Sequence, residues 1–346
     1  MEFLDRVRLA GRILVNGTSA GGGGRRQQRE IPAITPDEVV EAKAFFPLDK
    51  FFIFGHARSG TTLLARLIRL HPQVHCNWQA HFFTRPPLLL SLVDREEVSA
   101  WLARRSNRWN RGRDLSPVIL RAVADFVLER EARREGKTIV GDKSPNSLLD
   151  GEAVRLTHAV YPDARLIFII RDGRDTVLSH RLQSFIDGTQ HLSKGDLQIR
   201  ADFMQHPEHF QGGRRSLFRA KGLQRAAQGW VHNLSETDRA GRELFHDRYT
   251  FLRYEDLLAD PWSQLEQLWA FLGATRPVAG LRETVIQEME QNPDADWQQH
   301  KAGELVQTVK KGQQGNWREL FTPHDKQVFQ EVAGATLAAW GYDGQD

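Results

Sequence analysis

The stretch FGHARSGTTLLARL, residues 54–67, decides the fold because it joins an apolar run to a helical pattern through a glycine-rich loop. Four residues separate Gly55 from Gly60, and two threonines follow directly. A Walker-type phosphate loop places a lysine after its second glycine, where this chain has Thr61. The fixed cation of the loop is Arg58 instead. The stretch therefore predicts an anion site at a helix start, of a different kind from a Walker loop.

Short apolar runs alternate with amphipathic stretches over the rest of the chain. Such runs, flanked by charged and turn residues, are typical of buried strands in a parallel sheet. The alternation predicts an α/β fold with a central, mostly parallel sheet, helices on both faces and a P-loop-like nucleotide-binding core. We expect strands at 51–55, 137–141, 165–171 and 249–254, and helices at 60–70, 117–134, 173–183 and 262–272.

The N-terminal part of the chain has a different composition. Residues 16–35 are rich in Gly, Ser, Arg and Gln, which is typical of a flexible linker. We therefore expect a flexible basic segment over 1–46 and a single domain over 47–346. Two irregular stretches near 84–115 and 184–230 are expected to be insertions, and long irregular segments inside a domain are usually functional or disordered.

The overall composition argues against several classes of protein. The 47 Lys+Arg residues nearly balance 44 Asp+Glu residues, which does not favour bulk nucleic-acid binding. The single cysteine, Cys76, excludes an intrachain disulfide and a cysteine-based metal site. No run approaches the roughly 20 apolar residues that span a bilayer, and the first residues lack the pattern of a signal peptide. We expect a cytoplasmic protein without a nucleic-acid partner or stable membrane insertion.

The glycine-rich loop and the helix after it provide several anion ligands. Backbone N–H groups at a helix start attract anions, and the helix dipole reinforces them. The side chains of Arg58, Ser59, Thr61 and Thr62 add donors, and Gly60 lets the backbone approach a ligand closely. An ordinary capped turn between a strand and a helix would need none of this combination.

A second motif, RLIFIIRDGRDTVLSHRL at 165–182, brings an arginine to the end of a strongly apolar strand. Arg171 falls at the carboxyl end of that strand, at the same sheet edge as the loop, and Ser179 lies on the following helix. Together they could hold a second phosphate. Taken singly, Arg171 could be a surface arginine and Ser179 a polar residue of a helix face.

A third motif, KKGQQGNWREL at 310–320, is basic and rich in glycine. Lys310, Lys311 and Gly312 could form a loop that closes over an anion. Such a loop is common on protein surfaces, so alone it is weak evidence for an anion site. It indicates one only together with the other two motifs.

In this order the segments resemble the sulfotransferases that use 3'-phosphoadenosine-5'-phosphosulfate (PAPS). RSGTT resembles their 5'-phosphosulfate loop, IFIIRDGRDTVLS their 3'-phosphate element and KKGQQGNW their nucleotide-closing loop. LRYEDLLADP (252–261) resembles the segment that places Tyr254 near the nucleotide, and ETVIQEMEQNP (283–293) resembles the adenine-side segment. The arginine of RSGTT is closer to tyrosylprotein-type and bacterial members than to the cytosolic small-molecule enzymes.

The resemblance implies an enzyme that moves a sulfuryl group in line from PAPS to a hydroxyl or amine of a small-molecule or peptide acceptor. It implies no metal, because there is no triphosphate charge to neutralise. Arg58 would donate to the 5'-phosphate and the bridging oxygen. Lys143, in GDKSPN (141–146), would stabilise the charge that develops on the sulfuryl and leaving groups.

The catalytic base does not carry over from the resemblance. The glutamate pair that supplies it in tyrosylprotein sulfotransferases falls on Trp78 and Gln79, neither of which is a base near neutral pH. His81 is the first candidate and Asp142 the second, although His81 could instead be a hydrogen-bonded pocket histidine. Residues 78–115 and 184–230 are expected to select the acceptor. Aromatic residues there could line an apolar pocket, although core packing is the commoner role for such side chains. They are Trp78, Phe82, Phe83 and Trp109.

Two other functions remain open at this point. A P-loop kinase acting on a small molecule would need magnesium, so activity in a chelator separates it from a sulfotransferase. A non-catalytic protein could instead use its arginine clusters, at 25–29 and 214–219, to bind a nucleotide or a polyanion.

Overall fold

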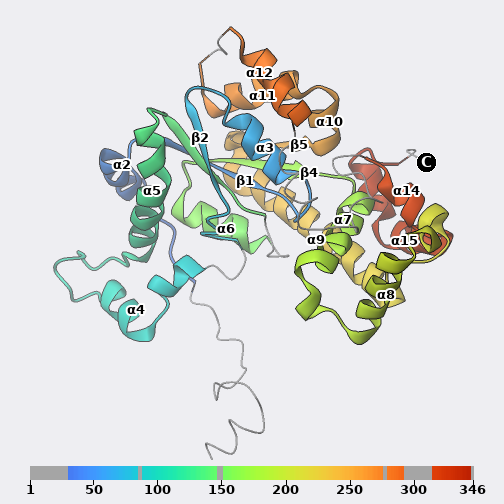
Figure 1. Ribbon diagram of the computed structural model, residues 1–346. Helices are drawn as coiled ribbons and strands as arrows, with labels where there is room; N and C mark the ends of the chain where they lie inside the picture. Colours follow the sequence, from blue (N-terminus) through green and yellow to red (C-terminus); the bar gives the residue numbers. More distant parts are fainter. Residues whose placement is uncertain (1–29, 85–87, 146–150, 276–278, 292–313, 344–346) are drawn as a thin grey trace, which may run out of the picture. The chain divides into compact units, whose positions relative to one another are not determined.

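The computed structural model describes residues 30–84, 88–145, 151–275, 279–291 and 314–343 (Figure 1). The chain divides into two compact units, Met1–Ile31 and Pro32–Asp346. The second unit contains the sheet and all the helices given below. Most of the expected N-terminal segment, residues 1–29, lies outside the described residues.

A five-stranded sheet forms the centre of this unit, in the order β2-β3-β1-β4-β5. All four strand pairs described are parallel, so the carboxyl ends of the strands lie along one edge. The predicted α/β fold with a mostly parallel sheet is confirmed. The strands are β1 (Asp49–Phe54), β2 (Val74–Trp78), β3 (Ile139–Lys143), β4 (Arg165–Ile170) and β5 (Tyr249–Arg253).

β2 is a strand that the hydropathy pattern does not reveal. Its sequence, VHCNW, contains two polar residues in five and lies at the edge of the sheet. His75 is nevertheless buried, because its Nδ1 atom pairs with a carboxylate oxygen of Glu135 at 2.8 Å. β2 brings Trp78 to the same edge as the glycine-rich loop.

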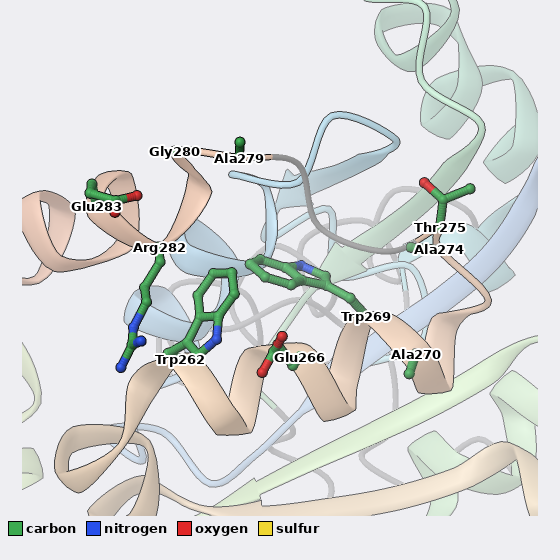
Figure 2. A pocket seen from close by; sticks show the side chains of 10 residues that line it. All are labelled: Trp262, Glu266, Trp269, Ala270, Ala274, Thr275, Ala279, Gly280, Arg282 and Glu283. Atoms are coloured by element: carbon green, nitrogen blue, oxygen red, sulfur yellow. The ribbon is translucent and has the colours of Figure 1, made fainter.

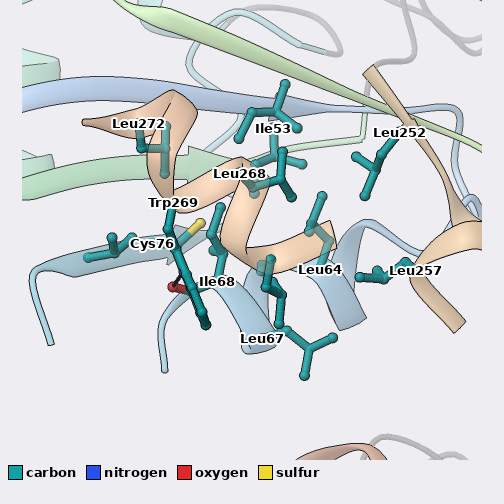
Figure 3. Close-up of a cluster of buried hydrophobic side chains, with 14 of the residues drawn as sticks. Ile53, Leu64, Leu67, Ile68, Cys76, Leu252, Leu257, Leu268, Trp269 and Leu272 are labelled. Carbon is teal, nitrogen blue, oxygen red and sulfur yellow. Dashed lines mark hydrogen bonds between the residues drawn. The ribbon is translucent and has the colours of Figure 1, made fainter. Parts of the chain in front are cut away.

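Apolar side chains on both faces of the sheet hold the helices in place. Side chains alternate between the faces of a strand, and on β1 Phe51 and Ile53 point into a cluster with helices α3, α11 and α12 (Figure 3). Helices α5 and α9 pack on the sheet from the other face, and α6 contacts both of them. The bounds are α3 (Thr61–Ile68), α5 (Ser116–Arg134), α6 (Glu152–Val160), α9 (Ala220–Phe245), α11 (Pro261–Leu272) and α12 (Leu281–Gln291).

The folded unit begins earlier than the composition suggests. Helix α2 (Pro36–Phe45) starts at a capping box in which Thr35 and Glu38 bond each other's backbone N–H groups. The N–H of Ile34 also donates to the carbonyl of Ala159 at 2.8 Å. The expectation of a flexible segment as far as residue 46 is therefore wrong for residues 32–46, because capping and packing order them.

The two expected insertions consist of short helices. The first contains η1 (Leu88–Leu92) and α4 (Glu96–Ala103), and the second contains η2 (Thr189–His191), α8 (Lys194–Gln205), η3 (Pro207–His209) and η4 (Gln211–Gly213). No helix within the described ranges combines the length and hydropathy needed to cross a membrane. The remaining helices are α7 (Gly173–Asp187), η5 (His246–Arg248), α10 (Tyr254–Ala259), α14 (Asn316–Leu320) and α15 (Pro323–Ala339).

Candidate functional site

The loop between β1 and α3 requires both of its glycines. Gly60 has a φ of 88°, and a Cβ atom there would lie 2.2 Å from the ring of Tyr254. A Cβ atom on Gly55 would lie 2.7 Å from the carbonyl oxygen of Ile169. The loop is therefore held tightly against β4 and against the start of α10, with the N-terminus of α3 behind it.

Arg58 connects this loop to the second predicted anion element. Its backbone is left-handed, with a φ of 77°, and its Nε atom donates to Oγ of Ser179 at 3.1 Å. Its carbonyl oxygen accepts a hydrogen bond from Arg171 at 3.2 Å. The structure therefore brings together residues that the sequence predicted for two separate phosphate sites.

Arg171 follows the last residue of β4 and is mostly buried. Its guanidinium lies over the ring of Tyr254, 4.8 Å from the centroid, and 3.8 Å from a carboxylate oxygen of Asp175. Burial raises the pKa of the Tyr254 phenol, and the positive charge of Arg171 opposes that rise. Tyr254 thus supports Arg171 from one side and closes over Gly60 on the other.

Two further donors lie at the start of α3. The hydroxyl of Ser59 is buried and, among the described residues, has no hydrogen-bond partner. The Nζ atom of Lys143, at the end of β3, donates to Oγ1 of Thr62 at 3.1 Å. Lys143 is fully buried and lies 5.3 Å from the ring centroid of Trp78. These donors suit a ligand with anionic oxygens.

Asp142, the second candidate base, is engaged on both of its oxygens. Oδ2 accepts the hydroxyl of Ser144 at 2.5 Å, and Oδ1 accepts the N–H of Ala80 at 3.0 Å. Burial raises the pKa of the Asp142 carboxyl to about 6, although these hydrogen bonds and Lys143 act in the opposite direction. The contacts make Asp142 a support for the chain after β2.

His81 belongs to the turn that Asp142 and Ser144 support. Its N–H donates to Oγ of Ser144 at 2.9 Å, and its Nδ1 atom lies 2.7 Å from Oγ1 of Thr84. Gln79 and His81 both have left-handed backbones, with φ values of 53° and 52°. Left-handed backbone is costly for residues other than glycine and persists where the surroundings enforce it. The turn places His81 just after the carboxyl end of β2, where Trp78 pairs with Lys143 of β3.

Asp175 is a member of the site that sequence patterns did not single out. Its carboxylate accepts the N–H of Gly315 at 2.7 Å and the N–H of Trp317 at 3.4 Å. The guanidinium of Arg174 lies 3.9 Å from the ring centroid of Trp317. These contacts attach the start of α14 to α7, whereas Lys310, Lys311 and Gly312 lie outside the described residues. In the sequence, Asp175 falls in the first turn of a helix, where the helix dipole alone stabilises a carboxylate. Nothing in the sequence therefore indicates its distant partners.

His56, in the glycine-rich loop, is a second group that the motif did not reveal. Its Nδ1 atom carries a proton, because it donates to the carbonyl of Ala57 at 2.8 Å. Burial, with a smaller contribution from nearby His180, lowers the pKa of His56 to about 4, although the hydrogen bond to Ala57 acts in the opposite direction. The two rings lie 6.3 Å apart. His56 is therefore neutral near pH 7 and adds no fixed charge to the loop.

The aromatic residues of the acceptor side have different surroundings. Phe82 and Phe83 are buried, and Phe83 packs against Phe52 at 5.9 Å between ring centroids. Trp78 is 43 % exposed at the sheet edge. Trp109 is exposed and stacked on Trp101. Of the two roles that the sequence left open, Phe82 and Phe83 therefore have the core-packing role, whereas Trp78 and Trp109 lie at the surface.

A cavity of about 590 Å³ lies elsewhere, between α11 and α12 (Figure 2). Trp269, which lines it, donates from its indole nitrogen to the carbonyl of Ile68, at the last residue of α3. The glycine-rich loop lies at the first residue of that helix, so the cavity is not the anion site. Its lining residues are Trp262, Glu266, Trp269, Ala270, Ala274, Thr275, Ala279, Gly280, Arg282 and Glu283.

Comparisons with known proteins identify a family. A family model described as Sulfotransferase family matches residues 50–277. A protein-tyrosine sulfotransferase of Drosophila melanogaster is 27% identical over 64% of this chain and 37% of its own length. Protein-tyrosine sulfotransferase A of Caenorhabditis elegans is 32% identical over 37% of this chain and 32% of its own length. The chain thus spans about a third of these curated relatives.

Among solved structures, a mouse sulfotransferase complexed with PAP is 16% identical to this chain. The match covers 86% of this chain and 89% of the mouse protein, with a TM-score of 0.46.

The raised pKa of Asp142 predicts a pH-dependent stability. Between about pH 4 and pH 6 the folded state keeps a proton that the unfolded state releases, so stability falls as pH rises through this window. Asp142→Asn removes this titration. Urea unfolding should show the variant gaining about 2 kcal/mol relative to the native chain from pH 4 to pH 6.5. Parallel stability curves for the two proteins would contradict the prediction.

Proposed function

This chain belongs to the sulfotransferase family, and we propose that it transfers a sulfuryl group from PAPS to a hydroxyl or amine of a small-molecule or peptide acceptor. The observation that carries the proposal is the contact of Arg58 with both Ser179 and Arg171. It connects a helix-start anion site to a second cationic site, as a nucleotide with separate 5' and 3' anionic groups requires.

In this proposal the loop from Arg58 to Thr62 holds the 5'-phosphosulfate. The buried Ser59 hydroxyl and the backbone N–H groups at the start of α3 supply donors. A side chain on Gly60 would collide with Tyr254, so a glycine is required for the loop to pack against that ring.

Arg171 and Ser179 hold the 3'-phosphate. Guanidinium groups bind phosphate through two parallel hydrogen bonds, and Tyr254 orients Arg171 by stacking on it. Lys310, Lys311 and Gly312 are proposed to close over the nucleotide. The attachment of Gly315 and Trp317 to Asp175 would position that segment close to Arg171.

The transfer itself requires two groups at the sheet edge. The acceptor oxygen or nitrogen forms a bond to sulfur while the bond from sulfur to the 5'-phosphate oxygen breaks, and the acceptor proton passes to a base. Lys143 stabilises the negative charge on the departing phosphate side, from its position beside Thr62. His81 accepts the proton, because Asp142 is already engaged by Ser144 and Ala80.

We expect Arg171→Ala to weaken PAPS binding about tenfold to a hundredfold, because a charge-assisted phosphate contact is lost. Binding of adenosine 5'-phosphosulfate, which lacks the 3'-phosphate, should change much less. Isothermal titration measures both affinities. Arg165→Ala, at the other end of β4, is the matched control and should bind both nucleotides normally. Equal losses for both nucleotides would remove Arg171 from the 3'-phosphate site.

Lys143→Met should lower kcat about a hundredfold while PAPS affinity changes little, because the charge of Lys143 is needed mainly in the transition state. The substitution keeps a long apolar side chain in the buried position. Steady-state sulfation of an acceptor found by mass spectrometry from a metabolite extract gives kcat, and the native enzyme should keep its activity in EDTA. A fully active variant would exclude Lys143 from the chemistry.

His81→Ala should lower kcat about a hundredfold or more, the usual contribution of a general base. The acidic limb of the kcat/KM pH profile should also disappear. His232→Ala, an exposed histidine on α9, serves as the control and should retain the limb. If the His81 variant keeps the limb and loses only affinity for the acceptor, His81 is a binding residue and not the base.

A further inference from the structure

Exposed apolar side chains are concentrated in one part of the chain. Fourteen large hydrophobic residues are exposed among the described residues, and seven of them fall within residues 92–127. In soluble proteins, large exposed apolar patches usually mark sites of interaction with other molecules. The seven are Leu92, Trp101, Trp109, Ile119, Val123, Phe126 and Val127.

Two tryptophans form the most distinctive feature of this region. Trp101 and Trp109 stack with ring centroids 4.6 Å apart and an interplanar angle of 27°. Both remain about half exposed, at 55 % and 49 %. A buried side chain, Asn110, holds the loop after α4 by donating to the carbonyl of Leu102 at 3.0 Å. Trp101 lies on α4 and Trp109 on this loop, so the stacked pair joins the helix to the loop.

Arginines lie close to the tryptophan pair in the sequence. Five of them between Ala103 and Asp114 are exposed, and no acidic residue occurs from residue 98 to residue 113. One of these arginines, Arg113, lies 3.8 Å from Glu38. We call residues 101–113 the Trp–Arg platform. Its exposed arginines are Arg104, Arg105, Arg108, Arg111 and Arg113.

We propose that the Trp–Arg platform docks on the surface of a membrane that contains anionic lipids. Tryptophan favours the level of the lipid headgroups, and arginines close to an anionic surface are attracted to it. Docking of this kind is peripheral and needs no spanning helix.

The aliphatic residues on the next helix favour a membrane over a nucleic acid. Ile119 and Val123 are exposed on the first turns of α5, directly after the platform. Single-stranded nucleic acids bind through base stacking on aromatic rings and through cations, and aliphatic side chains add nothing to stacking. The boundary of a bilayer accommodates both aromatic and aliphatic side chains. In Figure 1, α4 and the start of α5 lie next to each other.

Flotation of the full chain with vesicles tests the proposal. The protein should float with vesicles of phosphatidylcholine plus phosphatidylglycerol, much less with phosphatidylcholine alone, and less in high salt. The double variants Trp101→Ala/Trp109→Ala and Arg104→Gln/Arg108→Gln should each reduce partitioning about tenfold. Arg225→Gln/Arg239→Gln, on α9, removes the same charge elsewhere and should partition like the native chain.

Several outcomes would overturn the proposal. The native chain could stay off the anionic vesicles, or the two platform variants could partition as well as the α9 control. Binding of a single-stranded oligonucleotide or a polyglutamate peptide through the platform, without vesicle binding, would also reject it in favour of another partner. Because the substituted side chains are exposed, unchanged thermal unfolding of each variant shows that the fold is intact.

Discussion

Arg171 is the residue on which the geometry of the site depends. It donates to the carbonyl of Arg58, stacks on Tyr254 and faces Asp175, which holds the start of α14. One guanidinium therefore relates the glycine-rich loop, the ends of β4 and β5, and a segment near the C-terminus. Because a planar guanidinium makes several directional contacts at once, it is better suited to this position than lysine.

The charges at this edge also explain why the site suits an anion. The loop from Gly55 to Thr62 contains no carboxylate, whereas Arg58, Arg171 and Lys143 all reach it. The nearest acid to Arg171, Asp175, accepts two backbone N–H groups, and burial raises the pKa of its carboxyl while Arg171 opposes that rise. The three cationic side chains that reach the loop favour an anionic ligand there.

Local patterns were sufficient to predict four of the five strands and to place the glycine-rich loop, Arg171 and Ser179 at one sheet edge. The loop, Arg171 and Ser179 lie in short continuous motifs, so spacing alone brings them to one sheet edge. β2 was not predicted, because its polar residues make it look like a loop. In the fold, residues distant in sequence form hydrogen bonds with them, as Glu135 does with His75. The partners of Asp175 lie 140 and 142 residues further along the chain. A local sequence pattern cannot reveal contacts between residues so far apart in the chain.

The acceptor half depends on tertiary support in a different way. The turn after β2 contains two left-handed residues that are not glycine, Gln79 and His81. Residues of this kind do not form the turn by local preference, so the buried Asp142 and Ser144 must enforce it. Trp78 is the exposed last residue of β2, whereas Gln79 and His81 both belong to the turn that follows it. The candidate base, His81, therefore lies in the turn that Asp142 and Ser144 hold through hydrogen bonds.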